Sequence, residues 1–276
     1  MIKKKIGYGQ IILNISLFAM LVVVMLPFLW MVGTSLMRSG ESLTFPPKFI
    51  PDEITFEQYK TLFSKLNFTR NFLNSLFVAL LVTSVSLFIN SLAGFAFAKY
   101  KFKGNKKIFS LLLATMAIPG QVTMMPVFLM LNKLGLLNTY WGLVVTGSSS
   151  VFAIFMFRQY LASIPDDIIE SARIDGCSDF GIYWRIILPL AKPSLITLSI
   201  FTFMGSWNDF LWPLIVMSKE SMYTLPVALA NLFGEHLIDT ELMMAGSVIT
   251  ILPILIIFLL LQKYYISGIM AGSVKE

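Results

Sequence analysis

Residues 162–189 hold the side chains with the clearest chemical pattern, because this charged segment separates two strongly apolar stretches. Pro165 suits the first turn of a helix, and Asp166 and Glu170 follow where the positive end of that helix favours carboxylates. Ser163 stands three residues before Asp166, the spacing of a capping box. Exposed carboxylates on a short helix suit a charge-assisted contact with another protein. The alternative is an ordinary surface loop.

Gly176 is expected to end this helix, since glycine adopts the left-handed conformation without strain. A second helix is expected from Ser178 or Asp179, with four apolar side chains on one face: Phe180, Tyr183, Trp184 and Ile187. Pro189 marks the turn into the next apolar run. The pattern predicts two short helices around a glycine corner, a stiff projection into water.

A second group of polar side chains lies inside the apolar runs, where such groups are costly and often functional. Asp209 is the one ionisable side chain well inside a run. It could line a polar pathway with Asn90, Gln121, Thr202 and Asn208, beside the ring of Trp207. The alternative, which is the more frequent role at any single position, is that these groups only join helices.

The composition predicts an all-α integral membrane protein. Of the 276 residues, 57% are hydrophobic and 13% charged, too little polar surface for a soluble domain of this length. A bilayer core needs roughly 20 apolar residues per helix. Six runs suit this length: residues 11–36, 72–98, 108–131, 141–157, 195–216 and 242–261. They predict one transmembrane domain over residues 1–276, with the sequence Pro119-Gly120-Gln121 as a kink in the third run.

Lysines and arginines predict the orientation of the spans. If the N-terminus is cytoplasmic, 14 of the 21 lie on inner segments and seven on outer ones, and the C-terminus is also cytoplasmic. Residues 162–189 then lie inside, and residues 38–70 and 218–241 lie outside. The net charge of +6 follows from this topology and does not indicate nucleic-acid binding. The basic cluster at residues 99–107 is expected to set orientation and to contact anionic lipid.

The sequence disfavours an enzyme, which would need an acid–base or metal cluster at one depth. The spans offer one aspartate and no histidine. Cys177 is the one cysteine, and a small residue beside Gly176 is its expected role. His236 is the one histidine, so no metal site is expected there.

The order Glu-x-Ala, three residues, Gly, nine residues, Ile-x-Leu-Pro resembles the cytoplasmic coupling loop of the membrane subunits of bacterial ATP-driven importers. The matching residues are Glu170, Ala172, Gly176, Ile186, Leu188 and Pro189, and Asp175 lies within the motif. Ser171 departs from the family, where alanine is usual, by a small-for-small change. The stretch Trp207-Asn208-Asp209-Phe210 and residues 262–275 resemble the sugar-importing branch, specifically the smaller permease of the maltose-transporter type.

This resemblance implies a bacterial cytoplasmic-membrane complex of this chain, a second unlike permease, two ATPase subunits and an external sugar-binding protein. The coupling-loop residues would dock into the ATPase and convert its closure into alternating access. An outer loop would reach the binding protein through Ala230, Asn231, Leu232, Phe233 and Gly234. No cofactor is expected on this chain, because it has no phosphate-binding glycine loop; ATP and Mg would bind the partner.

The alternative function is a self-contained secondary carrier or channel, which would need no ATPase. Such carriers often show inverted repeats or paired broken helices, and the sequence shows no clear pair.

Overall fold

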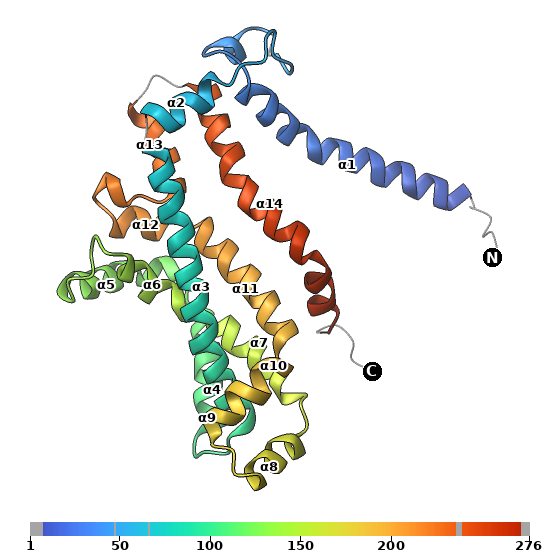
Figure 1. The fold of residues 1–276 in the computed structure, drawn as a ribbon, viewed down its shortest axis with the longest axis vertical. Helices are drawn as coiled ribbons and strands as arrows, with labels where there is room; N and C mark the ends of the chain where they lie inside the picture. The colour runs from blue at the N-terminus through green and yellow to red at the C-terminus, as the bar shows by residue number, and fades with distance from the viewer. Residues whose placement is uncertain (1–7, 47, 66, 236–238, 272–276) are drawn as a thin grey trace. The chain divides into compact units, whose positions relative to one another are not determined.

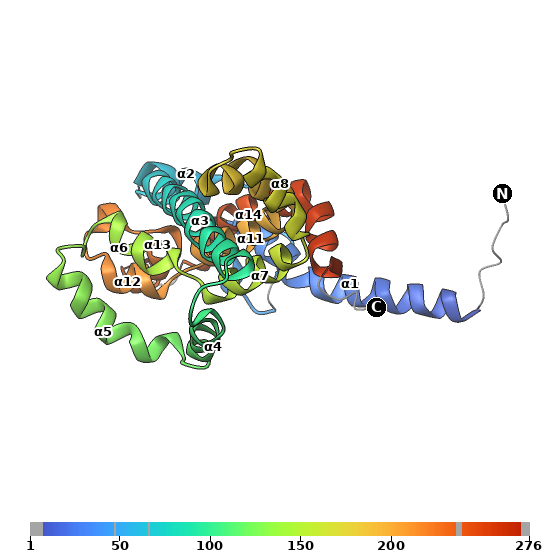
Figure 2. The same cartoon turned by 90° about the horizontal axis from the view of Figure 1, so that it is seen from below.

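The computed structural model describes residues 8–46, 48–65, 67–235 and 239–271, and every regular element in those ranges is helical (Figures 1 and 2). The longer helices are α1 (Tyr8–Ser35), α2 (Glu57–Lys65), α3 (Phe68–Lys99), α4 (Asn105–Thr115), α5 (Gly120–Lys133), α6 (Tyr140–Ser148), α7 (Val151–Ala162), α8 (Asp166–Ile174), α11 (Lys192–Trp207), α13 (Leu225–Glu235) and α14 (Thr240–Ala271). The shorter ones are α9 (Asp179–Ile182), α10 (Leu188–Leu190), α12 (Leu211–Val216), a π-helical turn at Tyr183–Ile187, and 3₁₀ turns at Glu41–Leu43 and Glu220–Met222.

Three helices in the described ranges are long and apolar enough to cross a bilayer: α1, α3 and the stretch Thr240–Gln262 of α14. They match the first, second and sixth predicted runs. Three bent pairs pass the same test if each pair counts as one span, which gives up to six spans. The sequence therefore predicted the helical class correctly, and the structure adds that the middle spans are broken.

The breaks have local causes. The 101° bend between α4 and α5 lies at Pro119, the kink expected from the sequence, because proline has no N–H and disfavours a helical residue before it. The 47° bend between α6 and α7 lies at Ser149, whose backbone is extended. There the hydroxyl of Ser150 caps α7 by accepting a hydrogen bond from the N–H of Ala153 (3.2 Å).

The fifth predicted run, residues 195–216, is not one helix. α11 bends by 81° from the preceding Asp179–Leu190 stretch and ends at Trp207; α12 resumes at Leu211. Asp209 lies in this gap, and its carboxylate accepts a hydrogen bond from the N–H of Trp212 (3.3 Å) at the start of α12. Pro213 lies just beyond the gap, inside α12.

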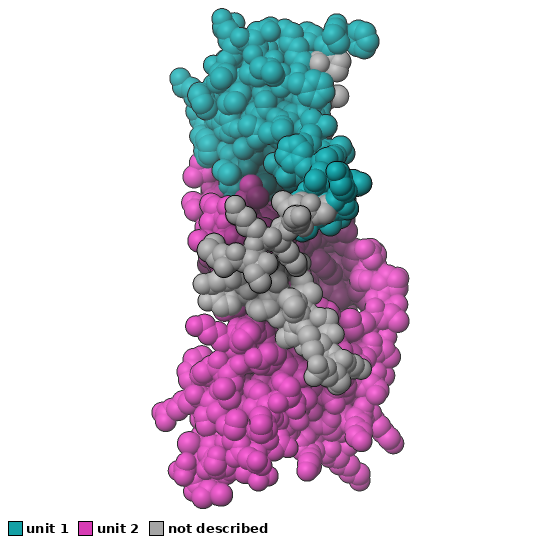
Figure 3. Space-filling model, turned by 90° about the vertical axis from the view of Figure 1, so that its right-hand side faces the viewer, with its two compact units in different colours: residues 1–68, 229–252 teal, residues 69–228, 253–276 magenta. Residues whose placement is uncertain are grey.

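The chain divides into two compact units, residues 1–68 with 229–252 and residues 69–228 with 253–276 (Figure 3). The single permease domain expected from the sequence remains a prediction about how they work together. In the first unit, the apolar stretch of α1 has no buried side chain. Elsewhere in that unit, the fully buried Glu241 accepts a hydrogen bond from the N–H of Ser42 (2.7 Å), fastening the segment after α1 to the start of α14.

The second unit is built around α3. One group of buried side chains joins α3 to α5, α6 and α12 through Val78, Leu131, Leu143 and Val216, among others. Further along, Gly94 lets α3 approach α7 closely. A Cβ atom there would lie 2.5 Å from the Cβ of Phe157, closer than two carbons can come. Because residue 94 is glycine, α3 can lie close to α7, the helix that leads into the 162–189 segment.

Candidate functional site

The 162–189 segment contains the two helices that the sequence predicts, α8 and α9, but α8 begins differently. The Ser163 hydroxyl donates a hydrogen bond to the carbonyl of Tyr160 (2.7 Å), in the turn that ends α7, and does not cap α8. The predicted capping box is therefore wrong. Pro165 holds the N-cap position without a side-chain bond, and Asp166 lies in the first turn of α8.

Gly176 makes the corner between α8 and α9, with a backbone φ of +81°. Its N–H donates to the carbonyl of Arg173 (3.0 Å), and the N–H of Cys177 donates to the carbonyl of Ala172 (2.9 Å). This pair of bonds is a Schellman motif, which needs a left-handed residue where Gly176 stands. α9 then starts at once, because the Ser178 hydroxyl accepts a hydrogen bond from the N–H of Gly181 (3.2 Å).

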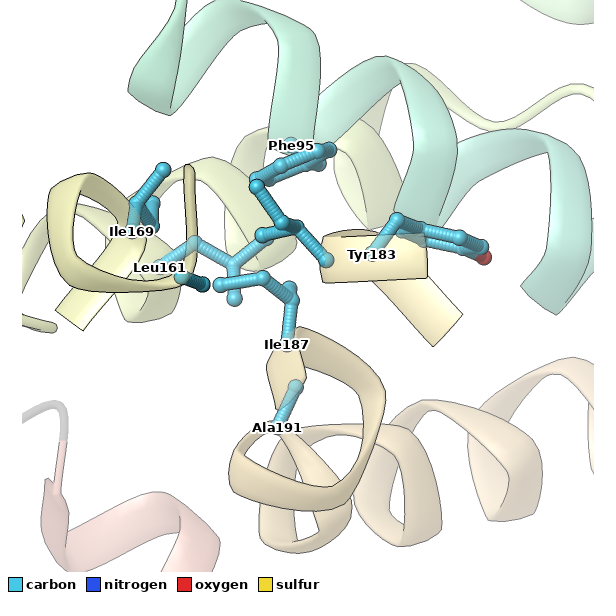
Figure 4. Close-up of a cluster of buried hydrophobic side chains, with 8 residues drawn as sticks. Phe95, Leu161, Ile169, Tyr183, Ile187 and Ala191 are labelled. Carbon is cyan, nitrogen blue, oxygen red and sulfur yellow. The ribbon is translucent and has the colours of Figure 1, made fainter. Parts of the chain in front are cut away.

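One side of the segment is packed into the protein. Its buried side chains meet Phe95 of α3 and Leu161 of α7 in one cluster (Figure 4). From the segment itself the cluster contains Ile169, Ala172, Ile182, Tyr183 and Ile187. The Tyr183 hydroxyl also shares a 2.7 Å hydrogen bond with Ser91 of α3. The segment therefore shares a hydrophobic core and a hydrogen bond with helices of the second unit.

The other side faces outward. Five of the eight predicted coupling residues are exposed: Glu170, Ser171, Asp175, Gly176 and Pro189. Ile186 and Leu188 are half-buried, and Ala172 belongs to the core. Three large apolar side chains join this face, with exposed fractions of 86% for Ile174, 59% for Phe180 and 56% for Trp184. Apolar groups exposed beside carboxylates suit a protein contact.

The prediction that Phe180, Tyr183, Trp184 and Ile187 share one face is wrong. Tyr183 and Ile187 are buried, whereas Phe180 and Trp184 stack on each other outside, with ring centroids 6.3 Å apart. The π-helical turn at Tyr183–Ile187 changes the number of residues per turn, so a spacing of 3.6 misplaces these side chains. Ile174 was missed altogether, because it lies between charged residues in the sequence.

Ion pairs fasten the segment to the end of α3. The ammonium of Lys99, whose side chain is nearly buried, donates to the carboxylate of Asp166 (2.6 Å) and to the carbonyl of Ile164. The hydrogen bond and charge of Lys99 hold the pKa of Asp166 below its ordinary value. Arg173 pairs with Asp179 (3.1 Å) across the corner and lies over the ring of Tyr100, 5.5 Å from its centre.

A cavity of about 310 Å³ in the second unit contains two of the six predicted pathway residues, Thr202 and Asp209. The hydroxyls of Ser150 and Ser206 line it as well, and the sequence did not single these out as pathway residues. Its remaining lining is Val78, Val82, Leu143, Gly147, Phe152, Ala153, Leu198, Phe201, Gly205 and Pro213. A polar wall beside apolar surface is typical of a site for a small polar solute.

The other four predicted pathway residues lie elsewhere. Asn90 is fully buried, donating to the carbonyl of Ser148 (3.0 Å) and accepting from the N–H of Ser150 (3.2 Å), so it joins α3 to the break between α6 and α7. Trp207 is buried between Phe72 and Phe203 and offers no open ring face. For these two the structure favours the packing alternative. Gln121 and Asn208 are exposed and line no described cavity.

The predicted outer contact lies on α13. Ala230, Asn231 and Leu232 are half-buried there. Gly234 also lies within α13, which continues to Glu235. The side chain of Phe233 and the residue His236 lie outside what the structure describes, as do residues 272–275 of the C-terminal match.

Comparison with known proteins places this chain in a family. Residues 88–270 match the family described as the binding-protein-dependent transport system inner membrane component. The chain belongs to this family. It is therefore a multi-pass component of the bacterial inner membrane.

Two curated relatives show the level of similarity. The arabinooligosaccharides transport system permease protein AraQ of Bacillus subtilis is 41% identical over 244 residues, which cover 88% of this chain and 85% of the relative. The alpha-glucoside transport system permease protein AglG of Rhizobium meliloti is 35% identical over 253 residues, covering 89% of this chain and 65% of the relative.

Two solved structures share the fold. One is a crystal structure of a bacterial ABC transporter involved in the import of the acidic polysaccharide alginate, with a TM-score of 0.85 at 24% identity, covering 96% of this chain and 99% of that chain. The other is a bacterial alginate ABC transporter in complex with an alginate pentasaccharide-bound periplasmic protein, with a TM-score of 0.63 at 19% identity, covering 93% and 96%.

Proposed function

We propose that this chain is a permease subunit of an ATP-driven, binding-protein-dependent sugar importer. It forms half of the translocation pathway together with a second, unlike permease. Two ATPase subunits on the cytoplasmic side bind ATP and Mg²⁺, and an external binding protein delivers the sugar. Family membership and the sugar-transport names of the relatives support the substrate class.

The single observation that carries the coupling role is the two-sided 162–189 segment. Its inner side is locked into α3 and α7 through the cluster around Tyr183, so force on the segment reaches those helices directly. Its outer side presents Glu170 and Ile174 to a partner. A rigid projection with a packed base and an open, mixed apolar and charged tip suits the transmission of movement between subunits.

The mechanism follows from this arrangement. ATP binding draws the two ATPase subunits together and moves the docked segment of each permease. α3 and α7 follow because they share a core with the segment, and the spans rock between inward-open and outward-open states. In the outward state sugar enters from the binding protein, and Thr202, Asp209 and the hydroxyl of Ser206 line a polar cavity along its path. Hydrolysis then resets the complex.

A partner is needed for α1 as well. A span whose apolar stretch buries nothing within its own chain must be covered by lipid or by another protein. The second permease is one such cover.

The first test is a mild-detergent purification of the tagged chain from its native membrane, followed by mass spectrometry. We expect an ATPase and a second multi-span permease to co-purify. A chain that purifies alone and transports sugar in liposomes without ATP would instead establish the carrier function. Broken helices are found in carriers too, and the three bent pairs here keep that outcome worth measuring.

A matched pair of variants tests the docking surface. Ile174 is 86% exposed at the tip of the segment and Ile50 is 79% exposed in the outer segment, so aspartate at either position leaves the core intact. Ile174→Asp should release the ATPase and abolish uptake, whereas Ile50→Asp should keep the ATPase bound. Equal ATPase retention in the two variants would contradict the docking role.

A further inference from the structure

A cavity of about 740 Å³ lies where α3 turns into α4, and we call it the lysine cup. It is lined by Phe97, Ala98, Tyr100, Lys101, Phe102, Lys103, Gly104, Asn105, Lys106 and Lys107. Four of these ten residues are lysines and none is acidic. All four lysine side chains are exposed, and within the described ranges none forms an ion pair with a carboxylate. The cup therefore carries net positive charge, and the nearest carboxylate named with these lysines is Asp166 of α8, whose pKa Lys101 helps Lys99 to lower.

The shape of the cup is set by the backbone. Gly104 turns the chain with a φ of +91°. The side-chain amide of Asn105 donates to the carbonyls of Tyr100 (2.9 Å) and Phe97 (3.4 Å) and so closes the turn against the end of α3. Lys106 and Lys107 then lie in the first turn of α4, where no side chain caps the helix. The lysines are thus held around a formed hollow, which an anion can enter without reorganising the turn.

Apolar surface continues from the cup along α4. Phe102, Ile108 and Leu111 are exposed, with Leu111 reaching 69%. A ligand that matches both features has an anionic head and hydrocarbon chains, because a free phosphate would leave the apolar rim bare. Lys99 ties the end of α3 to Asp166, so the cup lies at the same end of the second unit as α8 and α9 (Figure 1). Under the topology of the proposed function, that end meets the cytoplasmic leaflet, where anionic lipids gather.

We propose that the lysine cup binds the phosphate of an anionic membrane lipid, with Lys101, Lys103, Lys106 and Lys107 around the phosphate and the acyl chains along α4. The assignment to the cytoplasmic leaflet rests on the proposed function, whereas the binding of an anionic lipid does not. Tyr100 lines the cup and also lies under the guanidinium of Arg173 in α8. Tyr100 therefore connects the cup to α8.

The test measures lipid retention by native mass spectrometry on the protein as purified from its membrane, with any subunits that co-purify, in nanodiscs of phosphatidylcholine with a small fraction of phosphatidylglycerol. The variant is Lys106→Gln with Lys107→Gln. The control, Lys133→Gln with Lys219→Gln, removes the same charge at two exposed lysines outside the cup. We expect the variant to bind phosphatidylglycerol on the order of 30-fold more weakly and the control to match wild type, given the contribution of each lysine near an anionic surface.

Two further arms make the result decisive. Lys106→Arg with Lys107→Arg should retain the lipid, since the charge is kept. An excess of inorganic phosphate should not displace it; displacement would identify a soluble anion as the ligand and overturn the lipid proposal. Equal lipid loss in the variant and the control would also overturn it. Because binding is measured without ATP, sugar or binding protein, its failure leaves the importer function intact, and a failed importer function leaves the binding result standing.

Discussion

Substitution of Gly176 is the sharpest test of the corner between α8 and α9. A side chain there would strain the backbone without clashing with another atom. Its φ is +81°, yet no atom lies within 4 Å of where a Cβ would be. An L-residue in the left-handed conformation costs roughly 1–2 kcal/mol. Gly176→Ala should therefore weaken the two Schellman hydrogen bonds by that amount, and Gly176→Asn by less, since asparagine tolerates this conformation better.

Hydrogen exchange of the backbone N–H groups of Gly176 and Cys177 measures this cost locally, since these groups bond the carbonyls of Arg173 and Ala172. A loss of 1–2 kcal/mol makes opening about 5- to 30-fold more frequent. Gly120→Ala is the control, because Gly120 has equally open surroundings and no positive φ. Unchanged exchange in Gly176→Ala, or faster exchange in Gly176→Asn than in Gly176→Ala, would refute the argument.

Three other predictions concern the second unit. Gly94→Ala should force α3 away from α7 and lower the free energy of unfolding by about 1–3 kcal/mol, as thermal unfolding would show. Gly205→Ala, with open space around its Cβ, should not lower it. Asn90→Ala should also lower the unfolding temperature, because it leaves buried backbone groups unbonded, yet keep sugar affinity in binding assays. Because Lys99 lowers the pKa of Asp166, their contact contributes stability above the ordinary carboxyl value of 3.8 and is lost as pH falls through the lowered one. The difference in melting temperature between wild type and Asp166→Asn should therefore stay constant from about pH 5 to 8 and shrink only in stronger acid.

The corner at Gly176 could be predicted from the sequence because its causes are local. A glycine after a short amphipathic run, followed by a serine, is enough to predict a helix end and a new helix start. The start of α8 was missed for a related reason: Ser163 had a suitable spacing, but α7 extends to Ala162 and uses the Ser163 hydroxyl itself. Two local patterns can use the same side chain, and the sequence does not show which of them forms.

The orientation of side chains in the site could not be predicted in the same way. Tyr183 and Trp184 differ in burial because of a π-helical turn, and no residue type marks such a turn in advance. Asn90 and Trp207 were chosen as pathway residues for their chemistry alone. Their burial depends on α7, α3 and α11, which are brought together only by the fold.

The division between continuous and broken spans has a consequence for how the chain enters the membrane during synthesis. α1 and α3, with 28 and 32 residues, each exceed the roughly 20 residues needed to cross and can be inserted as they emerge. α4, α5, α6 and α7 have 11, 14, 9 and 12 residues, so none of them crosses alone. We expect their final path to be settled after they leave the insertion machinery, by packing against α3. A nascent chain ending at residue 99 would thus already hold two complete spans. One ending at residue 162 would also carry four helices that are each too short to cross.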